Sequence, residues 1–252
     1  MKFTAAFRCL FAAAGAAFVL MAPPARGTLL SAGFEIQLEA WLGQGDLDFA
    51  NLFTKTTGST TIDFHADADG QGATFVLMSI AGRGAYGLFD LPGQIIGGYN
   101  PQSWNSSSGY NQTPTNADRT AFRYNVSTST IQRQNLVGQG FGQFQSYNHA
   151  VYGPSFGAGL DLHVGFGGGG SVTNLDYGYA HNYSYGGTSN GDDIVFGGPN
   201  RGIYSYFDVL ELEVYGFSPA QGNVPDTAGT LGLLGFALLG LIVSRRRRAQ
   251  TA

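Results

Sequence analysis

The first patterned stretch of the chain has the period of a helix. Phe34, Leu38 and Trp41 recur at intervals of three and four residues, so they share one helical face. Ser31 precedes them as a good N-cap residue, and Gly43 follows them as a good helix stop. The pattern predicts a short helix between these two residues.

Beyond this helix the pattern changes to that of β-strands. Residues 60–65 alternate between polar and apolar side chains, and residues 73–80 form a continuous apolar run typical of a central strand. The polar, glycine-containing residues 67–72 between them predict a hairpin connection. Further strands are predicted at residues 94–96, 121–126, 160–164, 194–196 and 207–215.

The last of these strands predicts how its two faces are used. Leu210, Leu212 and Val214 alternate with Glu211 and Glu213, so the apolar side chains face a core and the carboxylates lie on the other face. On that face Glu211 and Glu213 are either solvated or part of a binding surface. Loops rich in Gly, Asn and Ser separate the predicted strands. The whole pattern predicts a mainly β (α+β) fold, an antiparallel β-sandwich with a few flanking short helices.

The N-terminus has the features of a secretory signal. Lys2 and Arg8 precede an apolar stretch at residues 10–21, and the small residues 25–27 offer a cleavage site. We predict a signal peptide over residues 1–27, with the Sec translocon and signal peptidase as partners. Cys9, the only cysteine, lies inside it, so the mature chain has no thiol for disulfides, metal binding or catalysis.

The C-terminus combines a short polar motif, an apolar segment and a basic end. The segment 231–243 is shorter than the roughly 20 residues of a full membrane span. The order resembles a PEP-CTERM sorting signal, with Asp226 where Glu is usual. The motif and basic positions are Val224, Pro225, Asp226, Arg245, Arg246, Arg247 and Arg248. The resemblance implies a sorting tail at 223–248, with its motif at 224–227 and its basic stop at 245–248. It also implies an exosortase partner and a transient membrane anchor in a Gram-negative envelope.

Removing both ends makes the remaining domain, residues 28–222, strongly acidic. The full chain has 13 basic and 17 acidic residues, and the domain keeps 6 and 16 of them, a net charge of −10. Phosphate backbones would repel such a domain, so nucleic acid is excluded as a partner. The abundant Gly, Asn, Ser and Tyr are typical of extracellular β-proteins.

Several motifs within this domain resemble the TLDc domain of oxidation-resistance proteins, in the order in which that family has them. The most specific match is the run Gly-Pro-Ser-Phe-Gly-Ala-Gly-Leu-Asp-Leu at residues 153–162. The positions that carry the resemblance are Phe64, His65, Asp69, Gly97, Gly98, Tyr99, Trp104, Gly153, Pro154, Phe156, Gly157, Gly159, Asp161, Glu211 and Glu213. The resemblance spans residues 29–217 and implies a β-sandwich with flanking helices.

Two patterns suggest cofactors only superficially. The glycines at 165, 167 and 170 match a dinucleotide fingerprint, but no amphipathic helix follows them. Asp63, Asp67 and Asp69 are spaced like part of a calcium loop, yet His65 and Val76 stand where an EF-hand needs oxygen donors. A flexible loop and ordinary turn residues explain them as well, so no cofactor and no metal are expected.

Two classes of function remain. His163 and Asp161 share a strand face and, with a nearby hydroxyl such as that of Ser155, could form a secreted hydrolase. Aromatic residues beside polar loops instead suit stacking on sugars or contact with proteins, although they could simply cover a core. These are Tyr99, Trp104, Tyr110, Tyr147, Tyr152, Tyr177, Tyr179, Tyr183 and Tyr185.

The leading hypothesis is a non-catalytic binding or structural module of the cell envelope or extracellular matrix, whose ligand is an envelope protein or polysaccharide. The hydrolase is the alternative.

Overall fold

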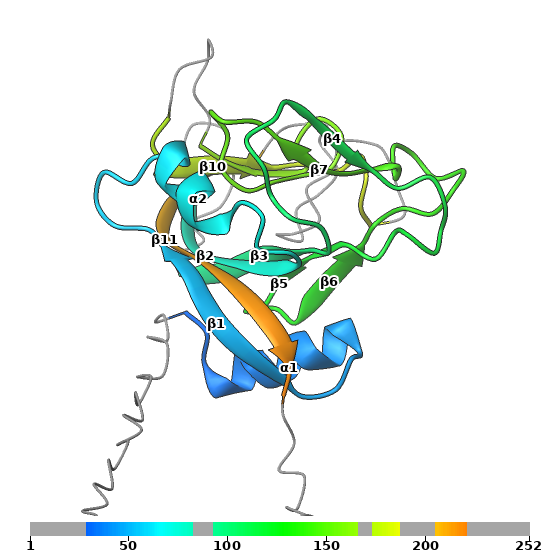
Figure 1. Cartoon of the computed structure of the whole chain (residues 1–252), viewed down its shortest axis with the longest axis horizontal. Coiled ribbons are helices and arrows are strands. Elements are labelled where there is room, and N and C mark those ends of the chain that lie inside the picture. Colours follow the sequence, from blue (N-terminus) through cyan, green and yellow to red (C-terminus); the bar gives the residue numbers. More distant parts are fainter. Residues whose placement is uncertain (1–28, 83–92, 166–172, 187–204, 221–252) are drawn as a thin grey trace, which may run out of the picture.

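The structure, a computed structural model, describes residues 29–82, 93–165, 173–186 and 205–220 (Figure 1). The helices are α1 (Ala32–Leu42) and α2 (Thr61–Ala68). The strands are β1 (Leu47–Thr54), β2 (Thr74–Gly82), β3 (Gln94–Asn100), β4 (Gly109–Gln112), β5 (Phe122–Asn125), β6 (Thr130–Arg133), β7 (Phe144–Asn148), β8 (Ser155–Phe156), β9 (Leu162–Val164), β10 (Tyr177–Ala180) and β11 (Ser205–Pro219).

The strands of the described ranges join a single antiparallel sheet. Their order is β4-β7-β8-β9-β10-β11-β2-β3-β5-β6, and β1 pairs separately with β11. The predicted mainly β fold with a few short helices is therefore confirmed. The sandwich consists of one continuous sheet folded on itself, because the half that contains β4, β7 and β10 lies over the half that contains β2, β3 and β5 (Figure 1).

Two hydrophobic cores lie on opposite faces of the central strands. Val76 and Met78 of β2 belong to the first core, between the two halves of the sheet, together with residues of α2, β8 and β9. Phe75 and Leu77, which alternate with them, belong to the second core, on the side of α1 and β1. Since both faces of β2 are covered, its sequence is continuously apolar.

The predicted first helix is confirmed as α1, including both of its ends. The Ser31 hydroxyl accepts a hydrogen bond from the backbone N–H of Phe34, at 3.4 Å. Gly43 ends the helix with a φ of 73°, in the left-handed region that glycine adopts readily. Leu38 is fully buried, and the Trp41 ring lies 5.5 Å from that of Tyr124.

The prediction of a strand at residues 60–65 is wrong, because these residues begin helix α2. The Asp63 carboxylate accepts hydrogen bonds from the backbone N–H and the hydroxyl of Thr60, both at 2.8 Å, and so fixes the first turn. Phe64 and Ala68 are fully buried, whereas Ile62 is 56% exposed. The hairpin predicted at residues 67–72 is also wrong, since these residues finish α2 and turn directly into β2.

The remaining strand predictions agree with the sheet where it is described. The apolar runs at 73–80, 94–96, 121–126, 160–164 and 207–215 correspond to β2, β3, β5, β9 and β11. The strand predicted at 194–196 lies outside the described residues.

The prediction that Leu210 faces the core is wrong. A bulge in β11 between Val209 and Glu211 shifts the alternation, so that Leu210 is 54% exposed. Leu212 and Val214 do lie in the first core.

The prediction that Glu213 is solvated is also wrong, because α1 and the segment before it cover that face of β11. Glu213 is 1% exposed, and its carboxylate accepts hydrogen bonds from the Leu29 backbone N–H at 3.0 Å and the Tyr215 hydroxyl at 2.5 Å. Glu211, on the other hand, is exposed as predicted.

The predicted signal peptide and sorting tail lie outside the described residues. Within the described ranges, no helix combines the length and the apolar character needed to cross a membrane.

Candidate functional site

The aromatic residues of the sequence motifs pack on one another inside the first core. The ring centroids of Phe64 and Trp104 are 5.7 Å apart, and Trp104 meets Phe156 edge to face at 5.4 Å. Gly98 leaves the space for Phe156, since a Cβ here would lie 2.6 Å from that ring. These three side chains are at most 1% exposed, so they hold α2, the segment after β3 and β8 together and present no surface to a ligand.

The neighbouring motif positions also serve packing. A Cβ at Gly97 would lie 1.8 Å from the carbonyl oxygen of Val76, so only glycine fits between β2 and β3. The Tyr99 ring is buried 5.1 Å from that of Phe75. Gly153 and Pro154 are buried as well.

Asp161 organises a loop from inside the protein. Its carboxylate accepts hydrogen bonds from the backbone N–H groups of residues 183–185, at 2.5 Å from that of Ser184. Gly157 makes room for it, since a Cβ there would lie 2.6 Å from the Asp161 Cγ. Burial raises the pKa of Asp161 to about 7, although the Arg123 guanidinium and the three N–H groups act in the opposite direction.

His163 pairs with a hydroxyl but not with Asp161. Its Nδ1 lies 2.7 Å from the Ser155 Oγ, and both residues are fully buried. The Ser155 hydroxyl donates to the carbonyl oxygen of Gly153 at 2.9 Å, so His163 donates its Nδ1 proton to Ser155. Burial lowers the pKa of His163 to about 3. The Asp161 carboxylate instead lies 3.5 Å from Nδ1 of His181.

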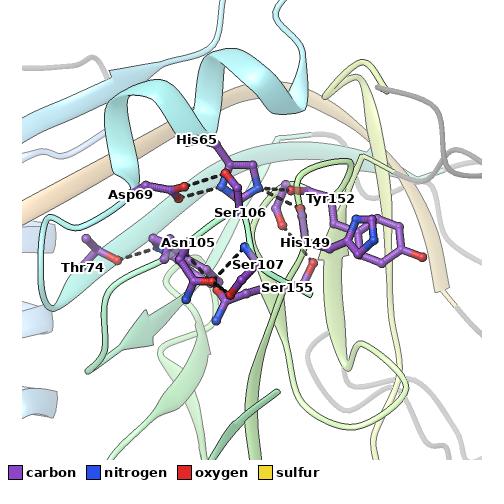
Figure 2. A network of polar contacts seen from close by, with 12 residues as sticks. His65, Asp69, Thr74, Asn105, Ser106, Ser107, His149, Tyr152 and Ser155 are labelled. Carbon is purple, nitrogen blue, oxygen red and sulfur yellow. Dashed lines mark hydrogen bonds and ion pairs between the residues drawn. The ribbon is translucent and has the colours of Figure 1, made fainter. Parts of the chain in front are cut away.

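His65, a motif residue, anchors the loop at residues 149–152 to helix α2 (Figure 2). Its Nδ1 lies 2.7 Å from the Asp69 carboxylate, and its Nε2 lies 2.9 Å from the carbonyl oxygens of both His149 and Tyr152. The Ser106 hydroxyl donates to the other oxygen of Asp69 at 2.7 Å. Because both imidazole nitrogens and both carboxylate oxygens have partners, this network fixes where the loop lies.

The residues of this loop complete an aromatic face. Tyr110 of β4 is paired with Tyr147 of β7 in the sheet, and their ring centroids are 4.7 Å apart. The Phe144 ring lies 4.6 Å from that of Tyr110. Tyr152 lies 5.6 Å from Tyr147, and His149 lies 5.1 Å from Tyr152. All five rings belong to partly exposed residues at the end of the sheet. We call Tyr110, Phe144, Tyr147, His149 and Tyr152 the aromatic face.

The aromatic face also gathers phenol hydroxyls. Burial, together with the phenols of Tyr152 and Tyr110, raises the pKa of Tyr147. Its hydroxyl therefore stays protonated at neutral pH, and it can both donate and accept hydrogen bonds.

Only some of the aromatic residues named from the sequence contribute to this face. Tyr110, Tyr147 and Tyr152 do, whereas Phe144 and His149 were missed because neither is a Tyr or Trp. Four of the others are buried, namely Tyr99, Trp104, Tyr179 and Tyr185. Tyr177 and Tyr183 are partly exposed on other parts of the surface.

The superficial cofactor patterns find no counterpart in the described residues. Asp63 caps α2 and Asp69 holds His65, so these carboxylates do not share one site. No group of three or more His, Cys, Asp or Glu side chains converges as a metal site in the part of the chain that the structure describes. Most of the glycine-rich segment 165–170 lies outside it.

Comparison with known proteins adds no relative. No model of a known protein family matches the chain, and a search of curated proteins finds no match either. The TLDc and PEP-CTERM resemblances therefore rest on the residues quoted above.

Proposed function

We propose that this chain is a non-catalytic binding module of the cell envelope or extracellular matrix, and that it recognises polysaccharide through the aromatic face. The observation that carries the proposal is the convergence of five partly exposed rings from β4, β7 and the loop at 149–152. None of the five belongs to the two hydrophobic cores. Their clustering at the surface therefore supports a role in binding rather than in folding.

The chemistry of the face suits sugar rings. A pyranose presents a flat C–H surface bordered by hydroxyl groups, and a tyrosine offers a flat apolar ring with a hydroxyl at its end. Tyrosine also loses little conformational freedom on binding, because only two side-chain torsions are fixed. Tyr110, Tyr147 and Tyr152 place three such groups next to one another, so that adjacent units of one glycan chain can each meet a ring.

The face is held in place before any ligand binds. His65 fixes the backbone of His149 and Tyr152, and Tyr152 packs edge to face on the buried ring of His163 at 4.9 Å. A surface ordered in advance loses less entropy when it binds. In this proposal the motif residues His65 and Asp69 act as positioning residues for the aromatic face.

The proposed location rests on the two ends of the sequence. A signal peptide at 1–27 would export the chain, and a PEP-CTERM-like tail at 223–248 would deliver it to an exosortase. The net charge of −10 between these ends favours a neutral glycan over a polyanion.

The hydrolase alternative receives less support from the geometry. A general base must accept the proton of its nucleophile, whereas here the Ser155 hydroxyl donates a hydrogen bond to Gly153 and accepts one from His163. Asp161, which would orient the imidazole, binds the loop at 183–185 instead.

The test is retention of the purified full-length protein on immobilised exopolysaccharide from the producing organism. We expect saturable retention, and we expect the double variant Tyr110→Ala/Tyr147→Ala to weaken it at least tenfold, equivalent to about 1.4 kcal/mol. Tyr177→Ala is the matched control, because Tyr177 is a partly exposed tyrosine of β10 outside the face.

Two results would contradict the proposal. One is a wild-type protein that the polysaccharide does not retain, and the other is a double variant retained as well as Tyr177→Ala. Retention of an envelope protein instead, lost in the same double variant, would keep the face as a binding site but assign it a different ligand.

A further inference from the structure

A hollow lies beside β6, the last strand of the sheet order. It has a volume of about 520 Å³, within the range of small-molecule sites. The six consecutive residues 130–135 line it, together with Leu136, Gln139 and Gly186. None of these residues belongs to the aromatic face.

The backbone of β6 offers hydrogen-bonding groups to this hollow. The N–H of Gly186 donates to the carbonyl oxygen of Arg133 at 2.9 Å, which shows that the Arg133 backbone points away from β5. Gln134 points the other way, since its N–H donates to Ala121 at 3.1 Å. Because the direction alternates along an antiparallel strand, Ile131 also points outward. The edge that lines the hollow therefore carries three backbone groups, namely the N–H and the C=O of Ile131 and the N–H of Arg133.

Gln132 adds a buried donor. Its side chain is 5% exposed, and its Oε1 accepts a hydrogen bond from Arg123 Nε at 2.7 Å. Its Nε2 is buried and has no hydrogen-bond partner within the described structure. Gly186 lies beside this amide, since a Cβ there would be in ordinary van der Waals contact with Gln132 Cδ at 3.4 Å. A buried amide N–H without a partner is unfavourable, so a ligand oxygen that accepts a hydrogen bond from it would be favoured.

We propose that this hollow is a binding site for the acetamido group of an N-acetylated hexosamine. The carbonyl oxygen of the acetamido group would accept hydrogen bonds from Gln132 Nε2 and the Ile131 N–H, and a hydroxyl group of the sugar ring would donate to the Ile131 carbonyl oxygen. The acetamido methyl group would pack on Leu136, a leucine that is 48% exposed.

The same groups fit an extended peptide less well. Strand addition gains its affinity from a ladder of backbone hydrogen bonds. In the described part of this edge, the groups left for such a ladder are the N–H and C=O of Ile131 and the N–H of Arg133, since Gly186 already occupies the Arg133 carbonyl oxygen. An edge of this length suits one amide group.

The hollow also suits a neutral ligand. The only charged side chain among its lining residues is that of Arg133, and its Nη2 donates to the Trp41 carbonyl oxygen at 2.8 Å. Its guanidinium lies over the Phe122 ring at 5.4 Å, toward α1. The Arg133 guanidinium is therefore bound on the other face of the sheet, away from the hollow.

The test is an NMR titration of the full-length protein with N-acetylglucosamine, glucose and N-methylacetamide. We expect N-acetylglucosamine to shift the side-chain amide of Gln132 and the backbone N–H of Ile131, with a dissociation constant on the order of 1 mM. N-methylacetamide should shift the same signals more weakly, and glucose should not shift them.

The matched variants are Gln132→Glu and Gln112→Glu. Glutamate at 132 keeps the acceptor for Arg123 but removes the Nε2 donor, so we expect at least a tenfold loss of affinity. The change at Gln112, exposed in β4, adds the same charge elsewhere and should leave binding intact.

Three outcomes would overturn the inference: no shift at Gln132 and Ile131 with N-acetylglucosamine, equal shifts with glucose, or undiminished binding by Gln132→Glu. If Gln132→Glu does not fold, the shifts of the wild-type protein decide. The aromatic face is tested separately, since exopolysaccharide retention depends on Tyr110 and Tyr147.

Discussion

Three buried titratable residues make the stability of the native state depend on pH, two histidines in one direction and an aspartate in the other. Burial lowers the pKa of His163 to about 3 and that of His181 to about 4, below their ordinary value of 6.5. These histidines bind protons only after unfolding, so they destabilise the native state as the pH falls below about 6.5. Burial raises the pKa of Asp161 from 3.8 to about 7, so this carboxyl group destabilises the native state as the pH rises from about 4 to 7.

Together these three residues predict how steeply the free energy of unfolding changes with pH. At pH 5 the two histidines bind two protons on unfolding and Asp161 releases one, so the unfolded state holds one proton more. The free energy of unfolding should therefore rise by about 1.4 kcal/mol per pH unit between roughly pH 4.5 and 6 from these groups. His163→Asn, whose side-chain amide can still donate to Ser155, should remove that slope.

Urea denaturation of both proteins across this pH range checks the prediction. Equal slopes in the two proteins would mean that His163 takes up no proton on unfolding, and the proposed linkage would be wrong.

Gly157 is required for two separate reasons. Its φ is 81°, which strains any other residue, and a Cβ would lie 2.6 Å from the Asp161 Cγ. Gly70, with a φ of 73°, has nothing within 4 Å of a Cβ and experiences only the strain. We expect Gly70→Ala to lower the free energy of unfolding by about 1 kcal/mol and Gly157→Ala by about 2–4 kcal/mol. Urea denaturation measures both, and similar losses would show that Asp161 moves aside easily.

At the scale of elements, the sequence pattern succeeds where one signal dominates. The caps of α1 and the long apolar runs of β2 and β11 are local features, so their elements could be predicted. Strand β4, in contrast, consists of Gly, Tyr, Asn and Gln, and only pairing with β7 makes it a strand. The pattern over residues 60–65 predicts a strand rather than helix α2, because over so few residues the apolar positions expected for a helix and for a strand overlap.

The correction at α2 leads to a prediction about Ile62 and Phe64. In a half-buried strand these residues would share the buried face, whereas in the helix Ile62 is 56% exposed and Phe64 is fully buried. We expect Ile62→Lys to change the free energy of unfolding by less than about 0.5 kcal/mol, and Phe64→Ala to lower it by about 3–5 kcal/mol. Chemical denaturation distinguishes the two, and a large loss in Ile62→Lys would argue for the strand.

The candidate site shows the same limit of prediction. Tyr110, Tyr147 and Tyr152 were recognisable as candidates, but the sequence does not show which tyrosines reach the surface together. That depends on the register between β4 and β7 and on His65, which holds a loop more than 80 residues away along the chain. The orphaned amide of Gln132 follows from packing around Arg123 and has no signal in the sequence.

At the scale of the whole molecule, a buried arginine links the two halves of the folded sheet. Arg123 of β5 is fully buried, and its Nη1 donates to the carbonyl oxygens of Asp161 at 2.6 Å and His181 at 2.5 Å. These two residues lie next to β9 and β10, in the other half of the sheet. A guanidinium can serve several acceptors at once, so one side chain satisfies carbonyl groups that the closure of the sheet would otherwise bury unpaired.

Removing this link should therefore destabilise the protein far more than removing an exposed arginine. We expect Arg123→Met to lower the free energy of unfolding by about 3–5 kcal/mol, because it leaves buried acceptors and the Asp161 carboxylate without their cation. Arg133→Met, on the exposed side of β6, should cost about 1 kcal/mol or less. In Arg123→Met, hydrogen exchange should accelerate in β9 and β10 before it does in β2 and β11, because the outer half of the sheet would separate first. Uniform acceleration in all four strands would instead show that the first core, rather than Arg123, holds the two halves together.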